Sequence, residues 1–184
     1  MNLDLYDEVN LLDNKDLIKK INLWSIGVLL ASVPVFWLIS YLYLGLAEAD
    51  LSTSDFFVSS ILCFGILFIH EGIHGLFFKI FKPGAKVVYG FKAGMAYAGS
   101  FGNKYPANQF IWILLAPFTL ITFGMLILTL VDVMSVYIFL FVGVIHTAGC
   151  IGDFYFTYLI LNTPGNVIVE DTDKGINIYQ KLNI

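Results

Sequence analysis

Long apolar runs alternate with short polar segments along this chain. Four of the runs are long enough to cross a lipid bilayer as helices, which takes about 20 residues each. They cover about 23–47, 56–78, 109–131 and 134–161. Pro34 and Pro117 fall inside the first and third runs, where proline is tolerated as a kink. The pattern therefore predicts an all-α integral membrane fold with four transmembrane helices.

Strand signals are confined to the polar segments. Residues 84–102, between the second and third runs, place β-branched and aromatic residues on both sides of a glycine-containing centre, which predicts a β-hairpin. The C-terminal tail, 162–184, resembles a short strand, a turn and a second strand. We therefore divide the chain into an N-terminal segment (1–22), a membrane domain (23–161) and this tail.

Composition supports the membrane assignment. The chain is 58% hydrophobic and only 13% charged, whereas a soluble domain carries roughly a quarter charged residues. Its partners are therefore expected to include the lipid bilayer, and no basic patch indicates nucleic-acid binding. The two cysteines, Cys63 and Cys150, lie in apolar runs without a CxxC spacing, and we interpret them as small packing residues.

The lysines are segregated along the chain. They precede the first run, separate the second from the third, and follow the fourth: Lys15, Lys19, Lys20, Lys79, Lys82, Lys86, Lys92, Lys104, Lys174 and Lys181. The two remaining loops carry acidic residues and no lysine. Because cytoplasmic loops of membrane proteins are enriched in lysine, both termini and the central loop are expected in the cytoplasm.

Ionisable residues interrupt the second run in the sequence HEGIH, residues 70–74. Residues four apart lie on one helix face, so His70 and His74 can direct their imidazoles at one metal ion. Glu71 lies about 100° round the helix and can act as a base without being a ligand. Zinc binds imidazole ligands well, and hydrolysis by a zinc-bound water needs a base beside the metal. The alternative is a chance pattern whose side chains are satisfied by hydrogen bonds between helices.

A third protein ligand for Zn²⁺ has two candidates in the fourth run, His146 and Asp153. His74 and His70 lie about 6 and 12 Å from the cytoplasmic end of their helix. Asp153 lies about 12 Å from the same end of the fourth helix, and His146 about 22 Å. Depth therefore favours Asp153 as the ligand, and the alternative is an aspartate that is hydrogen-bonded to a neighbouring helix. His146 is a candidate hydrogen-bond partner, an oxyanion stabiliser or a packed neutral histidine.

Several stretches together resemble one known family: HEGIHGLFF, YGF, AYAGSFGNKYP, LLAPF, HTAGCIGDF and VEDTDKGINIY. This is the bacterial membrane family of zincin-type metallopeptidases designated domain of unknown function 3267, and the resemblance covers roughly residues 60–180. The family is similar to site-2 proteases, intramembrane zinc enzymes that cleave membrane-anchored substrates near the cytoplasmic face. The resemblance implies His70, His74 and Asp153 as metal ligands, Glu71 as the base, and a location in the bacterial inner membrane.

One departure from site-2 proteases concerns the fourth run. GDF stands where those enzymes have LDG, and no Asn-Pro motif precedes it, so the asparagine that stabilises the oxyanion has no counterpart. This departure favours a second hypothesis, a non-catalytic zinc-binding scaffold or regulator. A third hypothesis is a small transporter or channel subunit that relays ions through its histidines and aspartate. The lack of internal symmetry argues against a transporter.

The favoured expectation is an intramembrane zinc metallopeptidase acting on membrane-anchored peptides or proteins. A helical substrate must unwind before cleavage, because its backbone amides are bonded within the helix. The predicted hairpin can hold the extended stretch as an added strand, through the segment formed by Val87, Val88 and Tyr89.

Overall fold

The computed structural model describes residues 3–44, 52–92 and 94–181. The chain forms two compact units. The strand–helix unit comprises Met1–Lys20, Glu71–Pro117 and Gly152–Ile184, and the helical unit comprises Ile21–His70 and Phe118–Ile151. The predicted end of the first span at 45–47, the loop acids Glu48 and Asp50, and residues 182–184 of the predicted tail lie outside the described residues.

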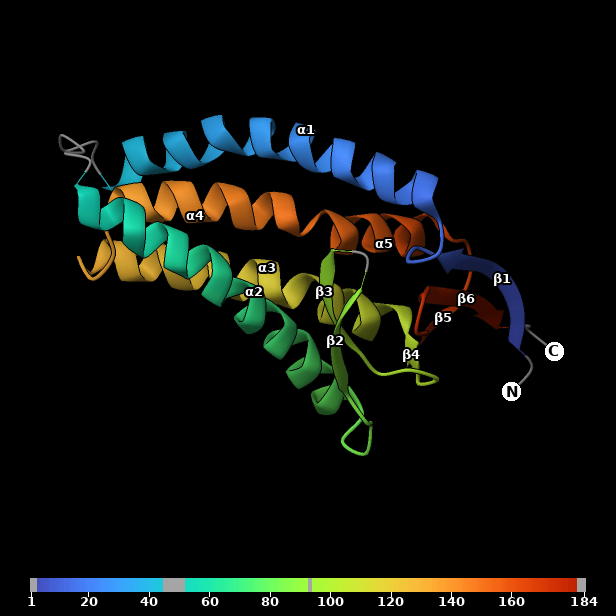
Figure 1. Cartoon of the computed structure of the whole chain (residues 1–184). Helices are drawn as coiled ribbons and strands as arrows, with labels where there is room; N and C mark the ends of the chain where they lie inside the picture. Colours follow the sequence, from blue (N-terminus) through green and yellow to red (C-terminus); the bar gives the residue numbers. More distant parts are fainter. Residues whose placement is uncertain (1–2, 45–51, 93, 182–184) are drawn as a thin grey trace. The chain divides into compact units, whose positions relative to one another are not determined.

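Helices account for most of the described chain (Figure 1). They are α1 (Lys15–Ile39, continued by the short π-helix η1, Ser40–Leu44), α2 (Thr53–Phe81), α3 (Ala107–Leu130), α4 (Val136–Gly149) and α5 (Ile151–Asn162). Within the described residues, three stretches are long and apolar enough to cross a membrane: Lys15–Leu42, Thr53–Phe81 and Ala107–Leu130. The pair α4 and α5 adds a fourth if it forms one broken span. Large apolar side chains such as Phe64 and Phe68 are 74% and 76% exposed, as expected of lipid-facing positions.

The predicted fourth span is two helices rather than one. The hydroxyl oxygen of Ser135 accepts a hydrogen bond from the Ile138 N–H and caps the start of α4. At the other end, the Cys150 N–H donates to the carbonyls of both His146 and Thr147, at 3.1 and 3.2 Å, a shared bond that is common in the last turn of a helix. Glycines at 149 and 152 flank the break and are poor helix formers. The interruption therefore separates His146 on α4 from Asp153 on α5.

A four-stranded antiparallel sheet lies in the strand–helix unit, in the order β1-β6-β5-β4. The strands are β1 (Leu3–Asn10), β4 (Lys104–Pro106), β5 (Val167–Asp171) and β6 (Gly175–Lys181). The all-α expectation was therefore only partly right. Strand β1 lies in the polar segment 1–22, where the sequence pattern predicts no strand, because β1 is mostly exposed and its partner lies far along the chain. Val9, the buried residue of β1, pairs with Ile176 of β6. The expected strand, turn and strand of the tail are β5 and β6.

The core of the strand–helix unit joins this sheet to α2 and α3. Its largest fully buried side chains are Tyr105, Phe110 and Ile113, together with Val169 of β5 and Ile178 of β6. Phe78 on α2 adds its ring, 5.6 Å from that of Tyr105 and 6.2 Å from that of Phe110. These contacts hold the end of α2 against the beginning of α3, and so orient the turn of α2 that carries His74.

The helical unit is held by contacts between α1 and α4, which run side by side in Figure 1. The rings of Phe36 and Phe139 lie 5.2 Å apart, and the Ser25 hydroxyl donates to the Ala148 carbonyl at 2.9 Å. Gly143 of α4 faces the Phe36 ring closely enough that any β-carbon would collide with it. Small residues thus allow close packing of two helices, as is common in membranes.

A separate two-stranded hairpin precedes the sheet strand β4. Strand β2 (Val88–Lys92) pairs antiparallel with β3 (Met95–Gly99), with Val88 opposite Gly99. Gly94 adopts a φ of 82°, which glycine reaches without strain. The Tyr89 ring packs directly over Gly75 of α2, where a β-carbon would collide with it. The hairpin is thereby anchored to α2 one residue beyond His74.

Candidate metal centre

His74 is held by its own helix and by α3. It is buried in the strand–helix unit, and its Nδ1 donates a hydrogen bond to the carbonyl oxygen of Ile113 at 2.8 Å. Histidines that bind metals commonly donate one ring N–H to a carbonyl in this way, which orients the ring and leaves the other nitrogen as the ligand. The available ligand atom of His74 is therefore Nε2.

The His74 Nε2 atom lies 3.4 Å from Oδ1 of Asp153, in the first turn of α5. A hydrogen bond between a charged imidazole and a carboxylate would be shorter, about 2.7–2.9 Å. Two ligands of one tetrahedral zinc ion, with bonds of about 2.0–2.2 Å, are separated by roughly 3.4 Å. The two side chains are therefore spaced as neighbouring ligands, and their donor types suit zinc. The pairing of these residues, expected from depth alone, is present within one unit.

His70 lies one turn before His74 on the continuous helix α2, and so on the same face. It belongs to the helical unit, where its Nδ1 lies 3.3 Å from Nε2 of His146. Glu71 follows on α2 and is partly buried. The structure thus brings His146 to His70, while Asp153 meets His74.

The predicted substrate-binding residues lie at the start of the hairpin. Val88 and Tyr89 are in β2, and Val87 precedes the strand and packs against the core of the strand–helix unit. Within its sheet β2 pairs only with β3, among the residues that the structure describes. One edge of β2 therefore remains for a further strand.

Cys150 belongs to the same environment as His70, although its sequence context suggested only a packing role. Its Sγ lies 3.9 Å from Nδ1 of His70 and 3.7 Å from Nε2 of His146. The residue is fully buried, and its sulfur is not part of a disulfide. A sequence signal existed, because His146 and Cys150 have the same four-residue spacing as the two histidines of HEGIH.

Asp171, at the end of β5, is a second group that the sequence did not single out. Its carboxylate accepts a hydrogen bond from the backbone N–H of Ser100, and its own N–H donates to the Asn103 carbonyl at 3.1 Å. The Ser100 hydroxyl contacts the Tyr105 hydroxyl at 2.9 Å. Burial raises the pKa of Asp171 to about 7, although the Ser100 N–H acts in the opposite direction. This carboxylate therefore ties the segment after the hairpin to the C-terminal sheet.

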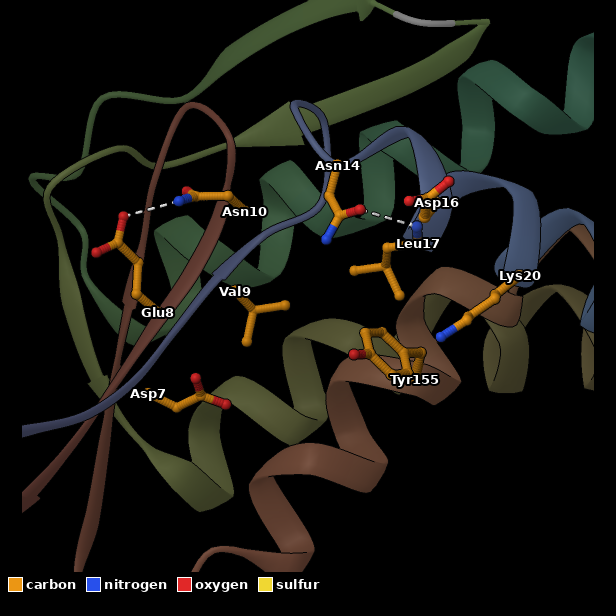
Figure 2. A pocket seen from close by; sticks show the side chains of 9 residues that line it. All are labelled: Asp7, Glu8, Val9, Asn10, Asn14, Asp16, Leu17, Lys20 and Tyr155. Carbon is orange, nitrogen blue, oxygen red and sulfur yellow. Dashed lines mark hydrogen bonds between the residues drawn. The ribbon is translucent and has the colours of Figure 1, made fainter.

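An open cavity of about 280 Å³ lies in the strand–helix unit between β1, the start of α1 and α5 (Figure 2). Its lining residues are mostly polar: Asp7, Glu8, Val9, Asn10, Asn14, Asp16, Leu17, Lys20 and Tyr155. Asn14 caps α1 by accepting the Leu17 N–H at 3.0 Å. The lining shares no residue with the candidate metal ligands.

Comparison with known proteins gives one match. The model of the family DUF3267, described as "Putative zincin peptidase", matches residues 63–168, which include HEGIH, His146, Cys150 and Asp153. No curated protein and no solved structure matches the chain significantly. The family implies zinc, and the donor set around His74 fits that ion. Since the match covers more than half of the sequence, the chain belongs to this zincin-type peptidase family.

Proposed function

We propose that the protein is an intramembrane zinc metallopeptidase that hydrolyses peptide bonds of membrane-associated substrates near the cytoplasmic face. Family membership supports a metallopeptidase, and the candidate spans support a membrane location. The observation that carries the proposal is the 3.4 Å approach of His74 Nε2 and Asp153 Oδ1, which matches the separation of two ligands of one zinc ion and is longer than a typical charge-assisted hydrogen bond.

In this proposal His70, His74 and Asp153 hold the zinc ion. His74 offers Nε2, since its Nδ1 is engaged by Ile113. His70 offers Nε2 as well, because its Nδ1 faces His146. When bound, zinc supplies Lewis-acid polarisation of the substrate carbonyl and lowers the pKa of a water molecule.

Glu71 is the proposed general base. It adjoins His70 on α2 but projects about 100° away from it, so its carboxylate can accept a proton while the histidines serve as ligands. The same carboxylate then delivers the proton to the leaving amide nitrogen. Its partly buried position in an apolar helix is typical of a functional ionisable group within a membrane.

The hairpin is the proposed substrate platform. A scissile segment must be extended, and an extended peptide can pair with a free strand edge. Strand β2 offers such an edge, and the Tyr89–Gly75 contact anchors it immediately after the HEGIH turn. We therefore assign Val87, Val88 and Tyr89 to substrate binding through the backbone.

Lysine distribution supports the proposed orientation. Lys79 and Lys82 lie at the end of α2 that follows HEGIH, so by the positive-inside rule that end of the helix faces the cytoplasm. Both termini lie on the same side in this arrangement, in a bacterial inner membrane. Membrane-anchored polypeptides are the expected substrates.

A second candidate function is a non-catalytic zinc-binding scaffold or regulator. It is favoured by the lack of an Asn-Pro motif before GDF, which leaves the oxyanion without its expected asparagine. The peptidase and the scaffold require the same zinc ligands, but only the peptidase would cleave peptide bonds.

Cleavage by purified protein distinguishes them. The full chain in lipid nanodiscs is incubated with a library of single-span reporter peptides, and cleavage is followed by mass spectrometry. The peptidase is expected to cleave some reporters, to lose activity with a chelator and to regain it with zinc. Zinc binding without any chelator-sensitive cleavage across the library would support the scaffold instead.

A further inference from the structure

We propose that His70, His146 and Cys150 form a second metal-binding set, suited to a zinc-class divalent ion held in part by a thiolate. The three residues lie in the helical unit, on α2 and at the end of α4. Their candidate ligand atoms all lie within 4.8 Å of one another. The set goes beyond the proposed peptidase, because its existence does not depend on peptide hydrolysis.

The spacing of the three atoms supports metal ligation. The separations are 3.3 Å between the two ring nitrogens, and 3.7 and 3.9 Å from the sulfur to each of them. Tetrahedral zinc, with Zn–N of about 2.05 Å and Zn–S of about 2.3 Å, places its ligands roughly 3.3 Å (N to N) and 3.6 Å (N to S) apart. A hydrogen bond from one imidazole to the other would be nearer 2.9–3.0 Å. The three separations among His70 Nδ1, His146 Nε2 and Cys150 Sγ therefore agree better with the distances between ligands of a tetrahedral zinc ion than with typical hydrogen-bond lengths.

The chemistry of the donors agrees with the spacing. Two imidazoles and a thiolate form a ligand set that zinc takes in proteins, and the thiolate selects against magnesium and calcium. His70, His146 and Cys150 are 9%, 6% and 0% exposed, so an ion here would be shielded from water on most sides. Three protein ligands leave one coordination position open.

Local structure explains how the set is assembled. The hydrogen bond from the Cys150 N–H to the His146 carbonyl, 3.1 Å long, keeps the last turn of α4 helical, so the two side chains share a face. His70 meets His146 edge to face, with ring centroids 5.5 Å apart and an interplanar angle of 73°. This arrangement directs a nitrogen of His70, rather than its ring face, at the other two ligands.

The two sets share His70 through different ring nitrogens, so simultaneous occupation of both would require the His70 ring to lose its N–H proton and bridge the ions as an imidazolate. Nδ1 faces His146 and Cys150, whereas the proposed catalytic ion would use Nε2. An ion at the second set would therefore hold His70 within the helical unit. The two sets nevertheless have separate ligands, Cys150 and His146 on one side and His74 and Asp153 on the other, so variants can distinguish them.

Cobalt substitution tests the proposal in the full-length protein. Cobalt(II) bound by a thiolate absorbs in the near ultraviolet through charge transfer from sulfur. We expect this band in the parent, its loss in Cys150→Ser and His146→Ala, and its retention in Cys63→Ser. It should also persist in Asp153→Asn, in which cleavage is expected to be lost. A parent protein without the band, or a Cys150→Ser protein that keeps it, overturns the proposal.

X-ray absorption at the zinc edge provides a test that needs no variant. The zinc-loaded parent should show sulfur scattering at about 2.3 Å, in addition to nitrogen and oxygen at about 2.0–2.1 Å. Nitrogen and oxygen scattering alone would overturn the second set. Cleavage without a thiolate signal would support the peptidase and exclude this second set. A thiolate signal without cleavage would support the second set and exclude the peptidase.

Discussion

Nε2 of His74 lies 3.4 Å from Oδ1 of Asp153, and Nδ1 of the same ring is bound 2.8 Å from the Ile113 carbonyl. The hydrogen bond to Ile113 orients the ring of His74. The approach to Asp153 places Nε2 and the carboxylate oxygen at the distance that separates two ligands of one metal ion. One helix therefore supplies the histidine, another its orienting carbonyl and a third the carboxylate. Zinc affinity should depend on each of these contributions.

Asp153→Asn tests the carboxylate ligand. Replacing the anion by a neutral amide should weaken zinc binding by at least about tenfold, as loss of even an orienting partner of a zinc ligand costs 10- to 100-fold. Competition titration in a Cys150→Ser background measures this site without the thiolate set. Asp132→Asn is the matched control, because Asp132 is exposed and has a φ of 60°, which asparagine tolerates. Equal zinc affinity in the two variants would remove Asp153 from the ligand set.

Gly75→Ala tests the anchoring of the hairpin. An added methyl group would collide with the Tyr89 ring, so the hairpin must shift and cleavage should fall, chiefly through a higher KM. Gly72→Ala on the same helix meets no atom within 4 Å, and should leave cleavage unchanged while stabilising α2 by up to about 1 kcal/mol. Steady-state kinetics and thermal unfolding in detergent measure both effects. Indistinguishable KM values for the two variants would contradict the assigned role of the hairpin.

Val88→Pro tests pairing of substrate with β2. Proline removes a backbone N–H and is poorly tolerated within a paired strand, so β2 loses strand geometry and kcat/KM should fall several-fold. Val88→Ala keeps the N–H and is the control for the lost side chain. Zinc content should be the same in both variants. Undiminished turnover by the proline variant would argue that substrate binds elsewhere.

Asp171 should make stability depend on pH. Its pKa is raised by burial from an ordinary value near 3.8 to about 7, so the folded state retains the proton over a range in which the unfolded state has lost it. Stability is then greatest at the acidic end and declines as pH rises from about 4 to about 7, by at most about 1.4 kcal/mol per pH unit.

The apparent melting temperature in detergent, measured from pH 5 to pH 7.5, tests this slope. Asp171→Asn keeps an oxygen acceptor for the Ser100 N–H and should flatten the dependence. The neighbouring, exposed Asp173→Asn serves as the control and should leave the slope intact. A parent protein that becomes more stable across the same interval would contradict the assignment to Asp171.

Local patterns predicted much of the helical structure and part of the site. Helical spacing alone places His70 and His74 on one face, and the apolar length of α2 identifies it as a candidate span. Depth along the helices selected Asp153, and the structure does bring it to His74, while the catalytic and ligand roles of these residues stay predictions.

Long-range pairing and helix breaks were beyond such reasoning. Strand β1 is mostly exposed and depends on β6 from the far end of the chain, so its own sequence carries little strand signal. The interruption at Cys150 depends on local bonds among His146, Thr147 and flanking glycines within an otherwise apolar run. Because the break between α4 and α5 was not predicted, Cys150 was interpreted as a small packing residue rather than as a neighbour of His70 and His146.

We assign Glu71 as the base of a zinc peptidase, and one paired measurement separates this role from that of a ligand or a packing residue. Zinc content and cleavage of a membrane-anchored reporter are determined together for the parent, Glu71→Gln and Glu8→Gln, an exposed carboxylate on β1. We predict that Glu71→Gln keeps its zinc and loses cleavage by at least about a hundredfold, since general bases contribute 10²–10⁴-fold. Glu8→Gln should match the parent in both. A Glu71→Gln protein that keeps its zinc and cleaves at the parental rate would contradict the claim.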